Sequence, residues 1–237
     1  MFLTNIVIGQ KLMFGFQTGY GTYKMSDLKS INNDIKYSNI PFDTKLVTDF
    51  QAYWYYRPSL LLKFKQNCLG LIYTFQSTGS RVSAKDYSGE YRFDMTVNSH
   101  CLGLYADGIF TSFGNYSINL YATGGILYSN LKINEYLGVF DTILTNQTNE
   151  FKALNYYIEP GLSLNYTYNQ LLFGISAGYF FTIATEDYYS GNNKQQKLYN
   201  SYSRTTVKPD WDGFRVGLFF SYFLLKDKDK NKKLTLL

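Results

Sequence analysis

Single charged residues interrupt segments that otherwise alternate between bulky apolar and small or polar side chains. Arg57, Lys63, Glu159 and Arg215 fall on the small or polar side of such segments, and Asp94 shares their phase. A charge enclosed among protein atoms must pair with an opposite charge, because its desolvation is costly. We therefore predict an internal cluster of salt bridges, centred on Glu159 with Arg57 or Arg215. A narrow path for ions along the same charges is the alternative.

The only histidine, His100, raises the question of nucleophilic chemistry. Ser99 precedes it and Asp94 lies upstream, so the residue types of a hydroxyl, imidazole and carboxylate system are present. Adjacent residues of a strand point to opposite faces, so a Ser99–His100 pair would need a β-bulge to act together. The alternation does change phase near 99–102, as a bulge would produce. We predict no catalytic residue.

The segments that carry these residues have the period of β-strands. In 213–225, GFRVGLFFSYFLL, one face holds Phe214, Val216 and Leu218, and the other holds Arg215 and Gly217. The pattern recurs over 11–25, 52–64, 68–77, 91–111, 116–131, 152–168 and 171–185, which gives about eight strands. Pro58, within one of them, marks a bulge or weakens that strand.

The connections between these strands alternate in length. Tight turns are expected at 65–67, 112–115 and 169–170, and long polar connections at 26–50, 78–90, 132–150 and 186–212. Ser26 to Lys29 could begin a short helix in the first of them. Long loops at one end, tight turns at the other and an outward apolar face are typical of a membrane barrel. We predict an all-β fold, a single antiparallel up-and-down transmembrane β-barrel of about eight strands with short periplasmic turns and long extracellular loops.

Composition agrees with this class and excludes others. The 237 residues include 24 Tyr and 19 Phe, which suits aromatic girdles at two membrane–water boundaries. The mean hydropathy is −0.23, as expected where lipid-facing and interior residues alternate. A net charge of +5, much of it in 226–233, lacks the dense basic face of a nucleic-acid-binding protein. Cys68 and Cys101 have no metal-ligand spacing, and we predict no metal, no cofactor and no disulfide.

The ends of the chain differ in character from its middle. Residues 1–10 read as a signal-peptide remnant or a disordered start, 11–225 as the barrel, and 226–237 as a charged periplasmic tail. Both termini are therefore expected in the periplasm. Residues of the predicted loops have the exposed aromatic and charged side chains of contact surfaces. The candidates for docking with another envelope protein are Asp86, Tyr87, Glu90, Tyr199 and Trp211.

Three segments resemble parts of a known group of proteins. TFQSTGSRVSAKDYSGEYRFD (74–94), GFQTGYGTYKMSDLK (15–29) and VTDFQAYWYYRPSLLLKF (47–64) are similar to small outer-membrane β-barrels of Bacteroidetes-type bacteria. The resemblance implies an OmpA/OmpX-like, porin-family-like barrel in the outer membrane of a Gram-negative cell, generally without an assigned activity. In such barrels the last strand often ends the chain on an aromatic residue, whereas a charged tail follows Phe223 here.

The function expected from these observations is a non-enzymatic outer-membrane barrel with a side-chain-filled lumen. It would serve envelope integrity, surface contact or an outer-membrane assembly. Its partners would be outer-membrane lipid and lipopolysaccharide, the barrel-assembly machinery during insertion, and an envelope protein. A lipid A-modifying enzyme and a narrow ion channel are the alternatives.

Overall fold

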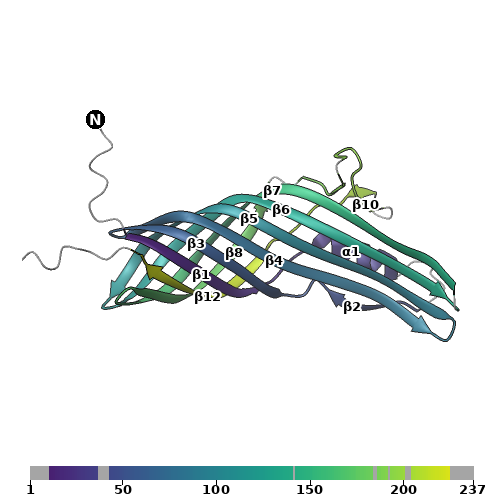
Figure 1. The fold of residues 1–237 in the computed structure, drawn as a ribbon, viewed down its shortest axis with the longest axis horizontal. Helices are drawn as coiled ribbons and strands as arrows, with labels where there is room; N and C mark the ends of the chain where they lie inside the picture. The colour runs from purple at the N-terminus through teal and green to yellow at the C-terminus, as the bar shows by residue number, and fades with distance from the viewer. Residues whose placement is uncertain are drawn as a thin grey trace, which may run out of the picture.

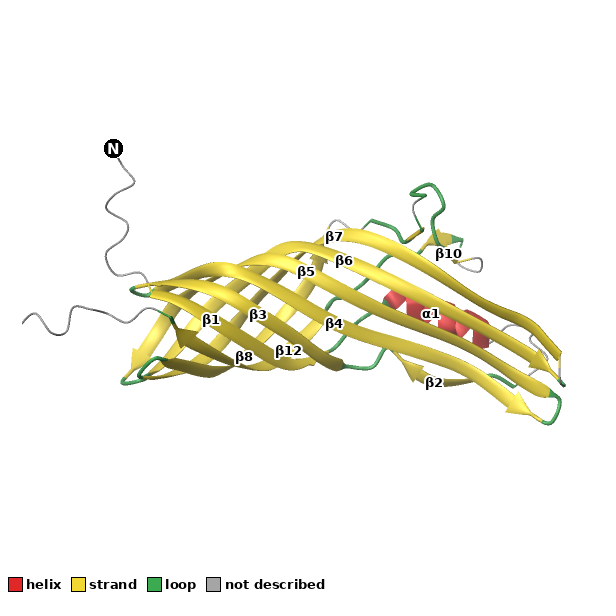
Figure 2. Cartoon of the chain, viewed as in Figure 1, coloured by secondary structure: helices red, strands yellow, loops and turns green. Residues whose placement is uncertain are grey.

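The computed structural model describes residues 11–36, 43–140, 142–183, 186–191, 193–200 and 204–224. The predicted start at 1–10 and tail at 226–237 lie outside this part of the chain. Strands dominate the described residues, as the alternating sequence pattern predicts (Figure 2). The elements are β1 (Lys11–Gly21), α1 (Ser26–Lys36), β2 (Lys45–Asp49), β3 (Tyr53–Phe64), β4 (Asn67–Asp86), β5 (Gly89–Phe113), β6 (Tyr116–Val139), β7 (Thr142–Tyr168), β8 (Leu171–Ile183), β9 (Tyr189–Ser190), β10 (Tyr199–Asn200), β11 (Thr205–Thr206) and β12 (Gly213–Phe223).

Eight of these strands form a closed antiparallel ring. The order is β4-β3-β1-β12-β8-β7-β6-β5, and pairing between β4 and β5 closes it. The first and last strands are neighbours, with Met13 opposite Phe223 and Gly21 opposite Arg215. This ring confirms the predicted up-and-down β-barrel. Closure leaves every ring strand with a partner on both sides, which is the condition for backbone in contact with lipid.

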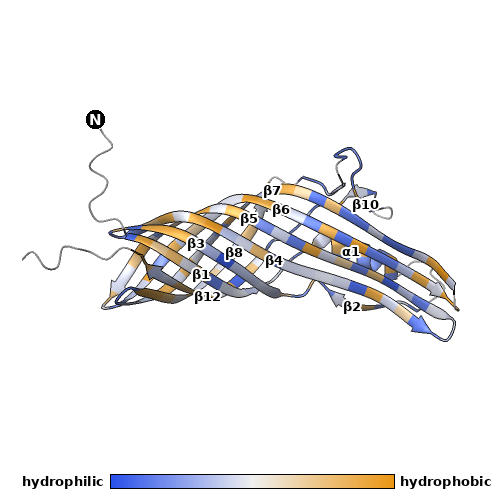
Figure 3. Ribbon diagram, viewed as in Figure 1, coloured by the Kyte–Doolittle hydropathy of each residue, from blue (hydrophilic) through white to orange (hydrophobic). Residues whose placement is uncertain are grey.

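Exposed apolar side chains occur on all eight strands of the ring, and hydrophobic residues recur along the ring portions of the strands in Figure 3. The middle of this outward face consists mainly of leucine and isoleucine, and aromatic side chains gather toward both edges, as in transmembrane β-barrels. One edge carries an aromatic row of Phe113, Tyr116, Tyr166, Phe173 and Phe220, whose successive ring centroids lie 4.8 to 6.1 Å apart. The exposed residues of the middle include Leu60, Leu71, Leu104, Leu120, Leu162, Ile175 and Leu218.

The two ends of the barrel are built differently (Figure 1). At the turn end, tight turns at 65–66, 114–115 and 169–170 join neighbouring strands. At the opposite end, the cap end, β4 to β7 continue beyond the ring. We call residues 78–86, 89–97, 131–139 and 142–151 the extension. The predicted loops 78–90 and 132–150 are wrong, because most of their described residues are paired strand residues, with Asp86 opposite Gly89 and Val139 opposite Thr142.

Side-chain polarity inverts where the strands pass from ring to extension. On the outward face, the row of Phe75, His100 and Tyr128 is followed by the polar row of Ser77, Asn98 and Asn130. The inward face changes at the same height from Ser99 and Ser129 to Val97 and Leu131. The register of β5 with both neighbours is continuous here, so the predicted bulge at 99–102 is wrong. The alternation changes phase in the sequence because the apolar side chains face outward in the ring and inward in the extension.

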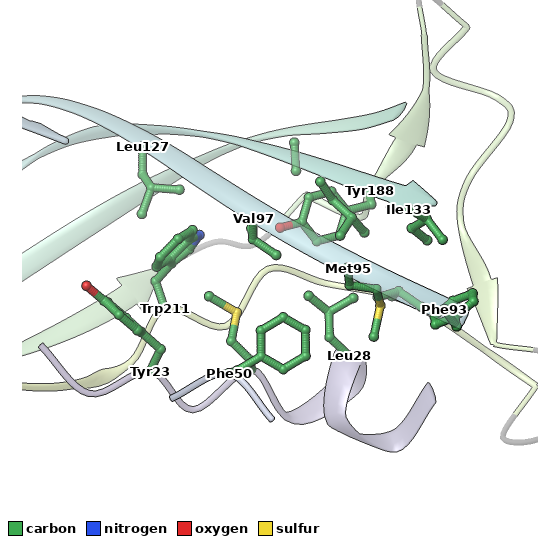
Figure 4. Packing of buried hydrophobic residues seen from close by; sticks show 14 of the residues in the cluster. Tyr23, Leu28, Phe50, Phe93, Met95, Val97, Leu127, Ile133, Tyr188 and Trp211 are labelled. Carbon is green, nitrogen blue, oxygen red and sulfur yellow. The ribbon is translucent and has the colours of Figure 1, made fainter. Parts of the chain in front are cut away.

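The extension has a conventional apolar core on its inner face (Figure 4). Val97, Met95 and Leu131 from the strands pack with Leu28 of α1 and with Phe50, which precedes β3. The predicted helix start at Ser26 is confirmed. No helix among the described residues has the length and apolar character needed to cross a membrane. The core also includes Tyr23, Met25, Val82, Tyr91, Phe93, Ile133, Tyr188, Val207 and Trp211.

Candidate functional site

The middle of the lumen contains a fully buried cluster of three charges. Glu159 accepts two hydrogen bonds from Arg57, at 3.1 Å from Nη1 and 2.5 Å from Nη2. Arg215 Nη1 donates a third, at 3.2 Å. Glu159 is 0% exposed, Arg57 2% and Arg215 1%. The structure thus brings together three of the five charges that the sequence suggested for the lumen.

Neutral side chains complete the surroundings of this cluster. Tyr121 Oη donates to Glu159 Oε1 at 3.1 Å, and Arg57 Nε donates to Thr74 Oγ1 at 2.9 Å. The guanidinium carbon of Arg215 lies 3.6 Å from the centre of the Phe180 ring, where the π-electrons offset part of its charge. Two cations around one carboxylate leave this cluster with a net positive charge.

Glycines make the space that Tyr121 occupies. A Cβ atom placed on Gly161 would lie 2.4 Å from Tyr121 Cζ, and one on Gly178 would lie 2.4 Å from Tyr121 Oη. These two glycines are cross-strand partners on β7 and β8. Side chains at either position would displace the ring, and with it the hydroxyl that reaches Glu159. The glycines on the small side of the predicted strands therefore serve the packing around the charges.

Proline follows two of the three charged residues in the chain. Pro58 comes after Arg57 in β3, and Pro160 comes after Glu159 in β7. The β3–β4 ladder skips from Tyr56 to Ser59, yet the register on either side is unchanged. Pro58 therefore interrupts pairing without forming the bulge that the sequence suggested, as a residue without an N–H must.

The other two predicted lumen charges lie outside the Glu159 cluster. The prediction for Asp94 is wrong, because it is on the outward face of the extension, where Arg81 Nε donates to it at 2.6 Å. Arg92 approaches the same carboxylate to 3.4 Å. The alternation predicts that the bulky residues of 91–97 face lipid, whereas they face the apolar core. Lys63 does line the lumen, but near the turn end, with Nζ 5.6 Å from the centre of the Phe223 ring.

Ser99 and His100 point to opposite faces of β5. Ser99 is fully buried in the lumen, where Gln76 Nε2 donates to its hydroxyl at 3.3 Å. His100 faces outward, and its Nδ1 lies 2.6 Å from Tyr73 Oη. Because no bulge occurs between them, the hydroxyl and the imidazole of this pair are separated by the barrel wall. Within the described residues, no group of three or more His, Cys, Asp or Glu could hold a metal ion.

Four of the predicted contact residues are at the surface of the cap end. Tyr87 is 97% exposed at the turn between β4 and β5, next to Asp86. Glu90 pairs with Lys85 at 3.4 Å, and Tyr199 Oη donates to the carbonyl of Arg204. These positions leave the aromatic and acidic groups of the hairpin tip open to solvent.

The fifth contact prediction, Trp211, is wrong. Its side chain is fully buried in the extension core, and its Nε1 donates to Ser129 Oγ at 3.1 Å. Tyr188 Oη shares a 2.7 Å hydrogen bond with the same hydroxyl. Burial raises the pKa of Tyr188, and the bond to Ser129 offsets part of that rise, so this phenol stays neutral at physiological pH. The described part of the connection 186–212 thus contributes Tyr188, Val207 and Trp211 to the core of the extension.

Sequence reasoning missed one exposed feature, the outer edge of β7. Residues 142–149 pair with β6 on one side. On the other side β9 reaches only Phe151 and Lys152, and among the described residues 142–149 have no backbone partner there. The segment TILTNQTN is uncharged and rich in β-branched residues, which was the available signal for a strand.

Comparison with known proteins gives likeness in architecture only. No family model and no curated protein matches the sequence. Among solved structures, Ail, the attachment invasion locus protein of Yersinia pestis, is similar at a TM-score of 0.39 and 12% identity, over 90% of this chain and 96% of that one. Ail has also been solved with the heparin analogue sucrose octasulfate. The outer membrane protease OmpT of Escherichia coli is similar at a TM-score of 0.36 and 13% identity, over 90% of this chain and 95% of that one.

Proposed function

We propose that this protein is a non-enzymatic, integral outer-membrane barrel that holds the extension outside the cell as a surface-contact element. The apolar belt and its aromatic edges support residence in a membrane, and closed antiparallel barrels are the spanning form of outer membranes. In such barrels the long excursions are extracellular. The extension is then outside the cell. The turn end, where β1 begins and β12 ends, faces the periplasm.

The observation that carries this proposal is the free edge of β7. An unpaired strand edge presents N–H and C=O groups that an extended peptide can pair with, which is a known mode of recognition. Proteins usually protect such edges with lysine, proline, a β-bulge or a covering segment. The pairing of β7 with β6 shifts register once, at Leu144, and is regular over 145–149. Residues 142–149 contain no charge and no proline, and Ile143 and Leu144 are 60% and 61% exposed. We therefore assign the contact role to this edge.

The interior supports a scaffold rather than a passage. The Glu159 cluster fills the middle of the lumen, and the extension core lies between it and the cap end. The separation of Ser99 from His100 removes the arrangement that a lipid-modifying reaction at this pair would need. The wild-type protein in planar lipid bilayers should give no discrete conductance steps. Regular steps would favour the ion-channel alternative.

The sequence resemblance extends the proposal to the cellular setting. We propose that the protein is a Bacteroidetes-type, OmpA/OmpX-like barrel, inserted by the barrel-assembly machinery and surrounded by lipopolysaccharide. The partner at the β7 edge is then another envelope protein or a surface that the cell meets. The exposed Tyr87 hairpin tip adds a second contact area at the same end.

Site-specific photo-crosslinking on intact cells tests the contact role. Benzoylphenylalanine at position 146, on the β7 edge, should give adducts with a partner. The same group at position 96, on the outward face of β5 in the centre of the extension sheet, is the matched control and should give few. Lysine in place of Thr148 should reduce the adducts from position 146, because it places a charge on the pairing edge. Equal adducts from positions 146 and 96 would contradict the assignment.

A further inference from the structure

A small cavity lies in the lumen between the Glu159 cluster and the turn end. Its volume is about 50 Å³. A buried water needs roughly 10–15 Å³ of such space, so the cavity has room for a few waters or one partly hydrated ion. Arg57 borders it toward the cap end, and Lys63, Ile109 and Phe219 are partly exposed lining residues toward the turn end.

One wall of this cavity consists of side chains whose oxygen atoms form no hydrogen bond with the described residues. Asn119 Oδ1, Ser163 Oγ and Asn165 Oδ1 are buried and have no partner among the described residues. The three residues are 6%, 4% and 3% exposed. Asn119 and Ser163 are direct cross-strand partners, and Asn165 is the next inward residue of β7. Side chains in such positions lie within about 5 to 8 Å of one another.

The orientation of Asn119 is fixed by its neighbour. Its Nδ2 donates to Asp107 Oδ2 at 3.2 Å, and the reversed amide would set an oxygen against that carboxylate. Asn119 Oδ1 must therefore face away from Asp107. Tyr105 Oη also donates to Asp107 Oδ2, at 2.8 Å. The Asp107 carboxylate thus supplies negative charge beside this wall, and the unbonded oxygens of Asn119, Ser163 and Asn165 are neutral acceptors.

Hydroxyl groups line the opposite wall, and a glycine between them leaves the room that they occupy. A Cβ atom on Gly15 would lie 2.5 Å from Ser59 Oγ and 2.6 Å from Ser221 Oγ. Both serines line the cavity. Oxygen ligands from amides, hydroxyls and one nearby carboxylate are the set that hard cations prefer. The lone carboxylate and the predominance of neutral oxygens fit a monovalent ion better than a divalent one.

We propose that this cavity binds one alkali cation, Na⁺ or K⁺, coordinated by Asn119, Ser163 and Asn165, with Asp107 supplying the charge. Glu159 offsets only part of the charge of Arg57, because Arg215 shares the same carboxylate. Lys63 is a second opposing charge, and its Nζ is turned toward the Phe223 ring. The bound ion would act as a structural ligand of the lumen at the turn end.

Two measurements on the folded protein in detergent micelles test the proposal. The midpoint of thermal unfolding should be higher in sodium or potassium chloride than in N-methylglucamine chloride at equal ionic strength, because that cation is too large for the cavity. The increase should saturate with concentration. The ²³Na NMR line should broaden with the protein and narrow again when K⁺ competes. Equal midpoints in all three salts, with no broadening, would mean that the cavity holds water only.

Substitutions assign the effect to this cavity. Asn165→Leu and Ser163→Ala should each abolish the cation-dependent shift, and Ser163→Ala is the milder change should Asn165→Leu fail to fold. Asn134→Leu, on the outward face of the extension in β6, is the matched control and should retain the shift. Retention of the shift and of the line broadening in Ser163→Ala would place the ion elsewhere and overturn the assignment.

Discussion

Strand β5 has two halves whose side chains follow opposite rules. In the extension, Phe93, Met95 and Val97 point inward to an apolar core while Arg92 and Asp94 point outward. In the barrel, the inward side chains are mostly small or polar, and the outward ones include Leu102 and Leu104. The backbone register is continuous between the halves. The surroundings of each half, water or lipid, therefore decide which face is apolar.

The extension and the barrel fill their interiors in different ways. The extension excludes water by packing apolar side chains of α1 and the connections against its sheet, as a soluble domain does. The barrel fills its lumen with charges that must satisfy one another, because a ring of eight strands has little room for solvent. The first interior depends on close packing, whereas the second depends on the pairing of charges.

The largest expected effect comes from breaking that pairing. Glu159→Gln would leave Arg57 and Arg215 buried without an acceptor charge, which costs about 3–5 kcal/mol of unfolding free energy. Denaturant unfolding in lipid vesicles measures the loss. Glu150→Gln, at an exposed position of the extension, should change the value by less than about 0.5 kcal/mol. A small loss in Glu159→Gln would mean that the lumen is hydrated enough to screen the charges.

The next prediction tests the outward faces of one strand. Leu120→Arg, in the belt of β6, should cost about 2–4 kcal/mol, because it exposes a cation to lipid. Asn134→Arg, outward on the extension of the same strand and opposite Asp94, should change stability by less than about 0.5 kcal/mol. Unfolding in vesicles of defined lipid compares the two variants. Equal costs would place the membrane boundary beyond Asn134.

The sequence predicted the barrel because period-two alternation is a local property that survives any change of surroundings. It also placed Arg57, Glu159 and Arg215 in one lumen, since each stands on the small side of its strand. It could not show which strands continue past the membrane. Residues 78–90 and 132–150 are polar on the outward face, and a polar segment between two predicted strands favours a loop.

The misplaced residues have two physical causes. Asp94 lies in the extension, where apolar side chains face inward, and the rule for a lipid-facing barrel assigns it to the wrong side. Trp211 stands in a long polar connection, which predicts an exposed side chain, whereas it packs into the core of the extension. The apparent phase change at 99–102 was the mark of the boundary, but a β-bulge gives the same mark in sequence. Only the register distinguishes the two. The edge of β7 is free because β8 ends before it reaches the extension. The alternation of side chains does not predict where a strand ends.

A smaller effect is expected from the core of the extension. Trp211→Phe would remove the Nε1 donor to Ser129 and leave a gap in the packing, at a cost of about 1–3 kcal/mol. The damage should stay at the cap end, so amide hydrogen exchange should rise in α1 and not in the ring portion of β8. Trp54→Phe, on the lipid-facing side, should leave exchange in α1 unchanged. Faster exchange in β8 with Trp211→Phe would show that the two interiors are coupled.

The smallest effect lies at the tip of the extension, farthest from the buried charges. Asp86 Oδ1 accepts hydrogen bonds from the hydroxyl and the backbone N–H of Ser88 and from the N–H of Gly89, which lower the pKa of this carboxyl from its ordinary value of 3.8. A lowered folded-state pKa means that the contribution to turn stability is present above the unfolded value and is lost as pH falls through the folded one. Exchange of the Ser88 and Gly89 amides should therefore show a local loss of protection on acidification below pH 3.8, relative to the intrinsic rates, while ring amides keep theirs. Asp86→Asn should remove this pH dependence, and an unchanged dependence in that variant would assign it to another group.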